Sequence, residues 1–150
     1  MSELVLVTGS GRGLGSSIAK SFIDNGYKVA INYFKSKEKA ENLSKKLGDD
    51  SHAFCADVSD VNQVKKMIDE IELVFNQTPS ILVNNAMTEY VFNGDERKLA
   101  DEISWEEICQ HLDVTLKGSL NLIQALIPSM KENSYGRIIN IGTNLVQNPV

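Results

Sequence analysis

Short apolar runs alternate with helical periodicities along most of this 150-residue chain. The first run, Leu4–Val7, is ended by glycine-rich sequence and is typical of a strand buried on both faces. Strands separated by helix-length segments predict a parallel sheet, wound by right-handed crossovers with helices on both faces. Further strands are expected at 29–31, 53–56, 81–83 and 138–141, and helices over 18–24, 37–47, 61–74 and 105–127.

Several residues mark the expected ends of these helices. Asn25-Gly26 ends the first helix, and Ser36 and Asp60 stand where N-caps of the next two are expected. Pro128 is expected to kink or break the long helix that Trp105 opens. The polar stretch between the fourth strand and that helix, residues 88–102, has few core residues and a turn signal at Gly94-Asp95.

Composition narrows the class of protein. Residues 1–150 are expected to form one domain, since there is no linker or repeat. A net charge of −5 argues against a nucleic-acid partner. No apolar run approaches the roughly 20 residues that span a bilayer, so no membrane partner is expected. Cys55 and Cys109 lie far apart without metal-ligand spacing, which favours reduced thiols, a cytoplasmic location and no metal site.

The turn after the first strand carries four glycines in seven residues. Glycines permit a tight turn and let a diphosphate approach the backbone at a helix N-terminus. A tight structural connection is the alternative interpretation. The spacing fits neither a P-loop, which needs a lysine after the glycines, nor GxGxxG, which fails at Leu14. The candidate nucleotide-binding residues are Gly9, Ser10, Gly11, Arg12, Gly13, Leu14 and Gly15.

The segment Thr8-Gly9-x-x-x-Gly13-x-Gly15 resembles the TGxxxGxG fingerprint of the short-chain dehydrogenase/reductase family. The resemblance implies a Rossmann-like doubly wound sheet, with further C-terminal strands and a substrate loop that this sequence does not include. Further matches in order and spacing are Asp57-Val58, Asn84-Asn85-Ala86, Leu116-Lys117-Gly118 and Gly136–Ile141.

The resemblance also implies roles for some of these residues. Asp57, with Val58 beside it, is similar to the family aspartate that contacts the adenine ring. Asn85 and Ala86 belong to an element similar to the family's NNAG, in which Met87 replaces the final glycine. Met87 either shapes the nicotinamide pocket or packs as an ordinary loop residue.

The end of the second strand bears on the choice between NAD(H) and NADP(H). An acidic residue there would bind the ribose hydroxyls and select NAD, but Asn32–Ser36 contains no acid. Arg12, Lys35 and Ser36 suit a 2′-phosphate, which attracts cations and hydroxyl donors. Lys37 could serve as well as Lys35, or both could be solvated. NADP(H) is therefore favoured over NAD(H).

The resemblance implies hydride transfer between the nicotinamide and a carbonyl or alcohol. Thr143 stands at the position of the family's catalytic serine, and Thr115 at that of the asparagine on the long helix. The family's Tyr-x-x-x-Lys pair would fall after Val150, and Tyr90 and Tyr135 lack a lysine four residues on. The chain alone is therefore expected to be inactive.

Three hypotheses follow. The leading one is an NADP(H)-dependent oxidoreductase of the 3-oxoacyl-acyl-carrier-protein reductase type. Its expected substrate is a small carbonyl or alcohol, either free or carried by an acyl carrier. The second is a non-catalytic nucleotide-binding or regulatory protein on this fold. The third, an S-adenosylmethionine methyltransferase, expects an acid where Thr8 stands and is disfavoured. Family members form homodimers or homotetramers, for which the long helix offers Leu112, Leu116, Leu120 and Ile123 as a contact face or as ordinary core.

Overall fold

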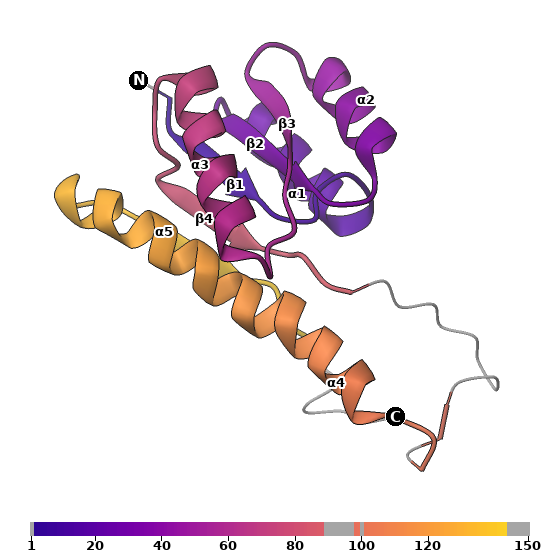
Figure 1. Ribbon diagram of the computed structural model, residues 1–150. Coiled ribbons are helices and arrows are strands. Elements are labelled where there is room, and N and C mark those ends of the chain that lie inside the picture. The colour runs from indigo at the N-terminus through magenta and orange to yellow at the C-terminus, as the bar shows by residue number, and fades with distance from the viewer. Residues whose placement is uncertain (1, 89–97, 100, 144–150) are drawn as a thin grey trace.

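The computed structural model describes residues 2–88, 98–99 and 101–143, and its strands form one parallel sheet in the order β3-β2-β1-β4-β5 (Figure 1). The strands are β1 (Leu4–Val7), β2 (Lys28–Tyr33), β3 (Ser51–Cys55), β4 (Ile81–Asn84) and β5 (Arg137–Asn140). The helices are α1 (Gly13–Asp24), α2 (Lys37–Leu47), α3 (Val61–Phe75), α4 (Trp105–Leu112) and α5 (Gly118–Glu132), with a π-helical turn, η2 (Asp113–Lys117), between the last two. The predicted doubly wound fold is confirmed.

Alternate residues of the strands contribute side chains to two hydrophobic cores, one on each face of the sheet. Leu4 and Leu6 of β1 belong to a cluster built with α3 and α5, whereas Val5 and Val7 belong to one built with α1 and α2. All four side chains are fully buried, as the uninterrupted apolar run predicted. The parallel pairing brings the carboxyl ends of all five strands to one edge, where ligands bind in open α/β sheets.

Strand β3 ends earlier than expected. The sequence predicted a strand over 53–56, and the structure places it at Ser51–Cys55, in register with β2 from Val29 to Tyr33. Asp57 therefore lies in the loop beyond the strand and does not close it.

The long helix runs as one rod through α4, η2 and α5 and lies beside α3 (Figure 1). The expectation that Pro128 breaks it is wrong, because α5 continues to Glu132. Pro128 faces outward, while Leu126 and Met130 on either side are buried in the core. Their burial offsets the hydrogen bond that proline cannot donate.

One side of this rod remains exposed. Leu112, Leu116 and Leu120 are 44%, 67% and 50% exposed, so they are not core residues of this chain. Ile123 is half-buried and packs against the α3 side of the core. In the part of the chain that the structure describes, no helix is both long and apolar enough to cross a membrane.

Asp60 caps α3 as predicted. Its Oδ1 accepts hydrogen bonds from the backbone N–H groups of Asn62 at 2.8 Å and Gln63 at 3.2 Å. The Gln63 side-chain amide donates to Oδ2, and this bond, followed by the backbone bonds, lowers the pKa of Asp60. Ser36, in contrast, occupies the N-cap position of α2 without any side-chain capping bond, so the expectation that it caps this helix is wrong.

The lowered pKa of Asp60 makes the cap sensitive to acid. A depressed carboxyl pKa adds stability above the unfolded-state pKa, near 3.8, and this stability is lost as the pH falls through the folded-state pKa. Asp60→Asn keeps an oxygen acceptor but does not titrate. We expect the free energies of unfolding of wild type and variant, measured in urea, to differ at pH 6 and to converge at about pH 2. A difference that does not change with pH would contradict this.

Candidate nucleotide-binding site

The turn after β1 is held in place by β2. The Ser10 N–H donates to the Asn32 carbonyl at 2.9 Å, and the Gly9 N–H donates to the Asn32 side-chain Oδ1 at 3.2 Å. The Asn32 amide donates in turn to the carbonyl of Ala56, beyond β3, at 3.1 Å. This buried asparagine therefore ties the turn to two neighbouring strands. Sequence reasoning missed it, although an asparagine in an otherwise apolar strand is a signal.

Thr8 joins the same turn to the loop after β4. Its Oγ1 accepts hydrogen bonds from the backbone N–H groups of Asn85 and Ala86, both at 2.9 Å. The Asn85 side-chain amide donates back to the carbonyls of Thr8 at 2.9 Å and Gly9 at 3.3 Å. The two loops are thus one hydrogen-bonded unit at the carboxyl edge of β1 and β4.

Three of the glycines allow close approach. Gly9 has φ +60°, and a Cβ there would lie 2.9 Å from Ala86 Cα. A Cβ on Gly15 would lie 2.8 Å from both the Gly9 carbonyl oxygen and Ser10 Cα. At Gly11, a Cβ would lie 2.6 Å from the Ser36 hydroxyl, so the turn packs directly on the start of α2. These three glycines therefore let the turn pack closely on the loop after β4 and on the start of α2; the turn Gly9–Gly15 is called the glycine cradle below.

Helix α1 starts at this cradle. The amide groups of its first turn, which begins at Gly13, lack partners within the helix and carry partial positive charge, as an anion site requires. Arg12 and Leu14 flank this turn and are exposed, whereas Gly15 is buried. The arrangement suits a diphosphate placed against the backbone of the turn.

The end of β2 lies next to the cradle. Ser36 contacts the turn at Gly11, and Lys35 is exposed just beyond the strand. Burial, followed by the Cys55 thiol, raises the pKa of the Tyr33 hydroxyl, which keeps this group uncharged near neutral pH. The residues from Asn32 to Ser36 include no carboxylate.

Asp57 and Val58 lie in the loop after β3, the strand that neighbours β2 in the sheet. Asp57 Oδ1 accepts hydrogen bonds from the Ser59 N–H at 2.9 Å and its hydroxyl at 2.7 Å, so this oxygen shapes the turn into α3. Val58 is buried against Gly118, whose Cβ would lie 2.6 Å from the valine Cγ2. A polar cleft of about 600 Å³ opens beside this turn, lined by Asp57, Ser59, Asp60, Val61, Gln63, Lys117 and Asn121.

The predicted catalytic threonines lie on other elements. Thr115 is exposed in the middle of η2, and its hydroxyl donates to the His111 carbonyl at 2.6 Å. Thr143 is exposed three residues after β5, which pairs with β4 through Asn84 and Asn140. Thr143 therefore lies beyond the carboxyl edge of the sheet, the same edge at which the loop carrying Asn85, Ala86 and Met87 leaves β4. The π-helical turn was not predicted.

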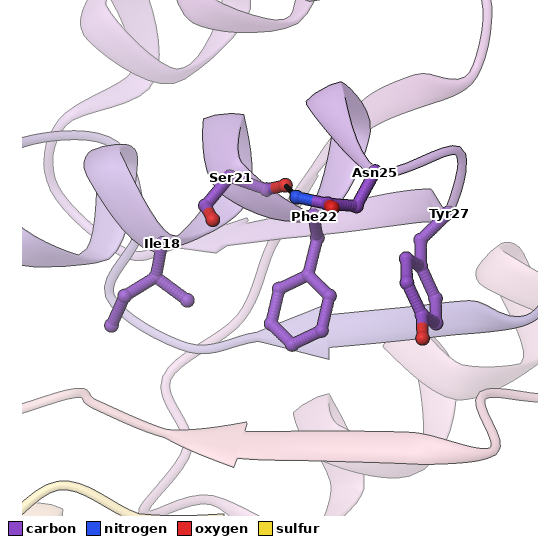
Figure 2. A pocket seen from close by; sticks show the side chains of 5 residues that line it. All are labelled: Ile18, Ser21, Phe22, Asn25 and Tyr27. Carbon is purple, nitrogen blue, oxygen red and sulfur yellow. Dashed lines mark hydrogen bonds between the residues drawn. The ribbon is translucent and has the colours of Figure 1, made fainter.

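Two other features do not join the site. Tyr135 lies before β5 at the opposite edge of the sheet, where its hydroxyl donates to Glu3 at 3.1 Å. Figure 2 shows a hollow lined by Ile18, Ser21, Phe22, Asn25 and Tyr27, at the end of α1 remote from the glycine turn. Among the residues described, no group of three or more His, Cys, Asp or Glu side chains could hold a metal.

The model of the short chain dehydrogenase family matches residues 3–150. A 3-oxoacyl-[acyl-carrier-protein] reductase of Staphylococcus aureus is 38% identical over 146 residues, which are 95% of this chain and 56% of the relative. The chain therefore belongs to the short-chain dehydrogenase/reductase family, as the motifs predicted. It spans about half the length of the curated relatives that it matches.

Solved structures agree with this assignment. A 3-ketoacyl-(acyl-carrier-protein) reductase of Brucella melitensis, complexed with NADH, has a TM-score of 0.88 at 29% identity and covers 99% of this chain and 60% of its own. A gluconate 5-dehydrogenase of Burkholderia cenocepacia, in complex with NADP and tartrate, has a TM-score of 0.81 at 31% identity, with 99% and 55% covered. Relatives thus include proteins crystallised with either dinucleotide.

Proposed function

We propose that this chain is the NADP(H)-binding part of a single-domain oxidoreductase that transfers hydride between the nicotinamide and a carbonyl or alcohol. The glycine cradle is the observation that carries the proposal. A side chain at Gly9 or Gly15 would collide with the protein's own backbone, so these glycines keep the turn compact, whereas nothing lies within 4 Å of a Cβ built on Gly13 at the start of α1, where a diphosphate would approach. In this proposal Gly9, Ser10, Gly11, Gly13, Leu14 and Gly15 hold the diphosphate and the adjoining ribose.

The preference for NADP(H) rests on the charges beside the cradle. Arg12 and Lys35 would supply cations, Ser36 would supply a hydroxyl, and no acid stands among Phe34, Lys35 and Ser36 directly after β2 to bind ribose hydroxyls. Asp57 and Val58 would border the adenine, on the side of β3. Asn85 and Ala86 would hold the nicotinamide side. When bound, the dinucleotide supplies or accepts the hydride.

Thr143 would donate a hydrogen bond to the substrate oxygen, which is the role of the serine found there in the family. Thr115 would take the place of the family's asparagine on the long helix, with its hydroxyl bonded to the His111 carbonyl. Turnover by this chain alone is not expected, because neither Thr143 nor Thr115 can replace the tyrosine of the family's Tyr-x-x-x-Lys pair. The relatives named 3-oxoacyl-[acyl-carrier-protein] reductase support a small carbonyl substrate, with a substrate bound to an acyl carrier as one form of it.

The exposed stripe of Leu112, Leu116 and Leu120 supports assembly into a homodimer or homotetramer through the long helix. The free thiols of Cys55 and Cys109 support a cytoplasmic location. A non-catalytic nucleotide-binding protein is the second candidate. The bond from the Thr115 hydroxyl back to its own helix favours it, because the side chain then does not reach outward as the family's asparagine does.

Nucleotide preference tests the proposal. Titration of the intact chain, followed by NADPH and NADH fluorescence, is expected to give the lower Kd for NADPH. Arg12→Ala should raise the NADPH Kd about tenfold or more, because a hydrogen bond between two charged groups is lost, and should leave the NADH Kd nearly unchanged. Lys20→Ala on the outer face of α1 is the control cation. Tighter binding of NADH, or no effect of Arg12→Ala, would contradict the assignment.

A further inference from the structure

The order of the strands divides a bound dinucleotide into two halves, if the proposed function holds. The 2′-phosphate group lies beyond β2 and the diphosphate lies over the turn after β1. Because β4 neighbours β1 on the other side, the nicotinamide half must extend over the loop after β4, at Asn85–Thr88. This loop is therefore the surface that the reactive half of the cofactor meets.

Met87 is the large apolar side chain of that loop. It is 66% exposed, and it stands at the position of the final glycine in the family element that Asn84-Asn85-Ala86 resembles. Leu14, 59% exposed on the first turn of α1, lies at the same edge of the sheet.

The backbone on both sides of Met87 is anchored. Before it, the Ala86 N–H donates to Thr8 Oγ1 at 2.9 Å. After it, the Thr88 hydroxyl is hydrogen-bonded to Nδ1 of His111, on the last turn of α4. The His111 carbonyl also accepts the hydrogen bond from Thr115, so the same residue joins the loop to η2.

These anchors distinguish Met87 from an ordinary exposed loop residue. A side chain whose two neighbours are fixed loses little further backbone entropy when a ligand packs against it. A thioether also makes favourable contacts with an aromatic ring. The His111–Thr88 bond lies outside the glycine cradle and serves no other evident purpose in the packing of α4, which buries no residue fully.

We propose that Met87 packs against the nicotinamide ring and sets how tightly this chain holds the reactive half of its cofactor. His111 is the positioning residue that fixes Met87 through Thr88. The adenine half is bound independently of both residues.

The test compares two ligands on the intact chain by calorimetry: NADP⁺, which has both halves, and 2′,5′-ADP, which lacks the nicotinamide. Met87→Ala is expected to raise the Kd of NADP⁺ about three- to tenfold and to leave that of 2′,5′-ADP unchanged. Met87→Leu, which keeps the volume, should recover most of the loss. Leu73→Ala is the control, since Leu73 is 83% exposed and lies near the C-terminal end of α3.

The positioning role has its own pair of variants. Thr88→Val removes the hydroxyl that is bonded to His111. This variant should bind NADP⁺ more weakly than wild type but bind 2′,5′-ADP equally well. Thr88→Ser should bind both ligands like wild type. His111→Leu should weaken NADP⁺ binding as much as Thr88→Val does, and the double variant should lose no more NADP⁺ affinity than either single variant.

Each remaining outcome is decisive. Equal losses for the two ligands in Met87→Ala, or no loss for NADP⁺, would overturn the role of Met87. Equal binding by Thr88→Ser and Thr88→Val would overturn the role of His111. If wild type binds 2′,5′-ADP but gains nothing from the nicotinamide half, the inference fails while the proposed nucleotide site survives. If wild type binds neither ligand, the proposed function itself fails.

Discussion

Gly15→Ala is expected to abolish measurable NADPH binding and to lower the free energy of unfolding by about 1–3 kcal/mol. The added Cβ would lie 2.5 Å from Asn85 Nδ2 and 2.8 Å from the Gly9 carbonyl oxygen and Ser10 Cα. The last two contacts are backbone atoms of the glycine turn, so the turn itself must move. Both the fit of helix α1 on the sheet and the cradle for the diphosphate are then lost.

Gly26→Ala provides a matched control for the effect on binding. Gly26 has φ +83° and nothing within 4 Å of the position that an added Cβ would take, so the variant suffers backbone strain of about 1–2 kcal/mol without any collision. Urea unfolding is expected to show both variants as destabilised, and NADPH titration at a temperature where both are folded is expected to show loss only for Gly15→Ala. Normal binding by folded Gly15→Ala would refute the cradle.

Local patterns predicted most of the fold. The apolar run of β1 and the cap at Asp60 depend on residues close together in the sequence, and both stand as expected. Pro128 shows where such reasoning fails. The proline opposes helix continuation locally, but Leu126 and Met130 are anchored in a core assembled from β1, β4 and α3, and the tertiary packing prevails.

The π-helical turn shows a second limit. The apolar residues of 105–127 recur at spacings of three and four, which a continuous α-helix also accommodates, so the pattern carried no signal for an i→i+5 turn. Thr115 was singled out for its chemistry, through the family resemblance. Its bond to the His111 carbonyl, however, depends on the local backbone geometry.

For the site, the sequence supplied the glycines but not their partners. Asn85 and Thr8 are 77 positions apart, and Asn32 contacts Gly9 across 23 positions. Contacts at such separations depend on the strand order, which places β1 between β2 and β4. The turn could therefore be recognised from the sequence, whereas the framework that holds it rigid could not.

A second large effect is expected at Thr8, which joins the glycine turn to the loop after β4. Thr8→Val has nearly the same shape as threonine but removes Oγ1, the acceptor for the N–H groups of Asn85 and Ala86. Thr8 is 1% exposed, so water cannot readily replace the hydroxyl. Leaving two such N–H groups without an acceptor costs about 1–3 kcal/mol each, and the free energy of unfolding should fall by about 2–5 kcal/mol.

Thr8→Ser separates the hydroxyl from the methyl group. It keeps the acceptor and should lose only about 1 kcal/mol, the cost of one buried methyl group. Urea unfolding of the three proteins is expected to rank wild type, then Thr8→Ser, then Thr8→Val in stability, and the reverse order of the two variants would contradict the role of Oγ1. Because the same hydroxyl joins the glycine turn to the loop of Asn85 and Ala86, folded Thr8→Val should also bind NADPH more weakly than Thr8→Ser. Stability and nucleotide affinity then change together, since one buried oxygen holds both the sheet edge and the surface that the cofactor would occupy.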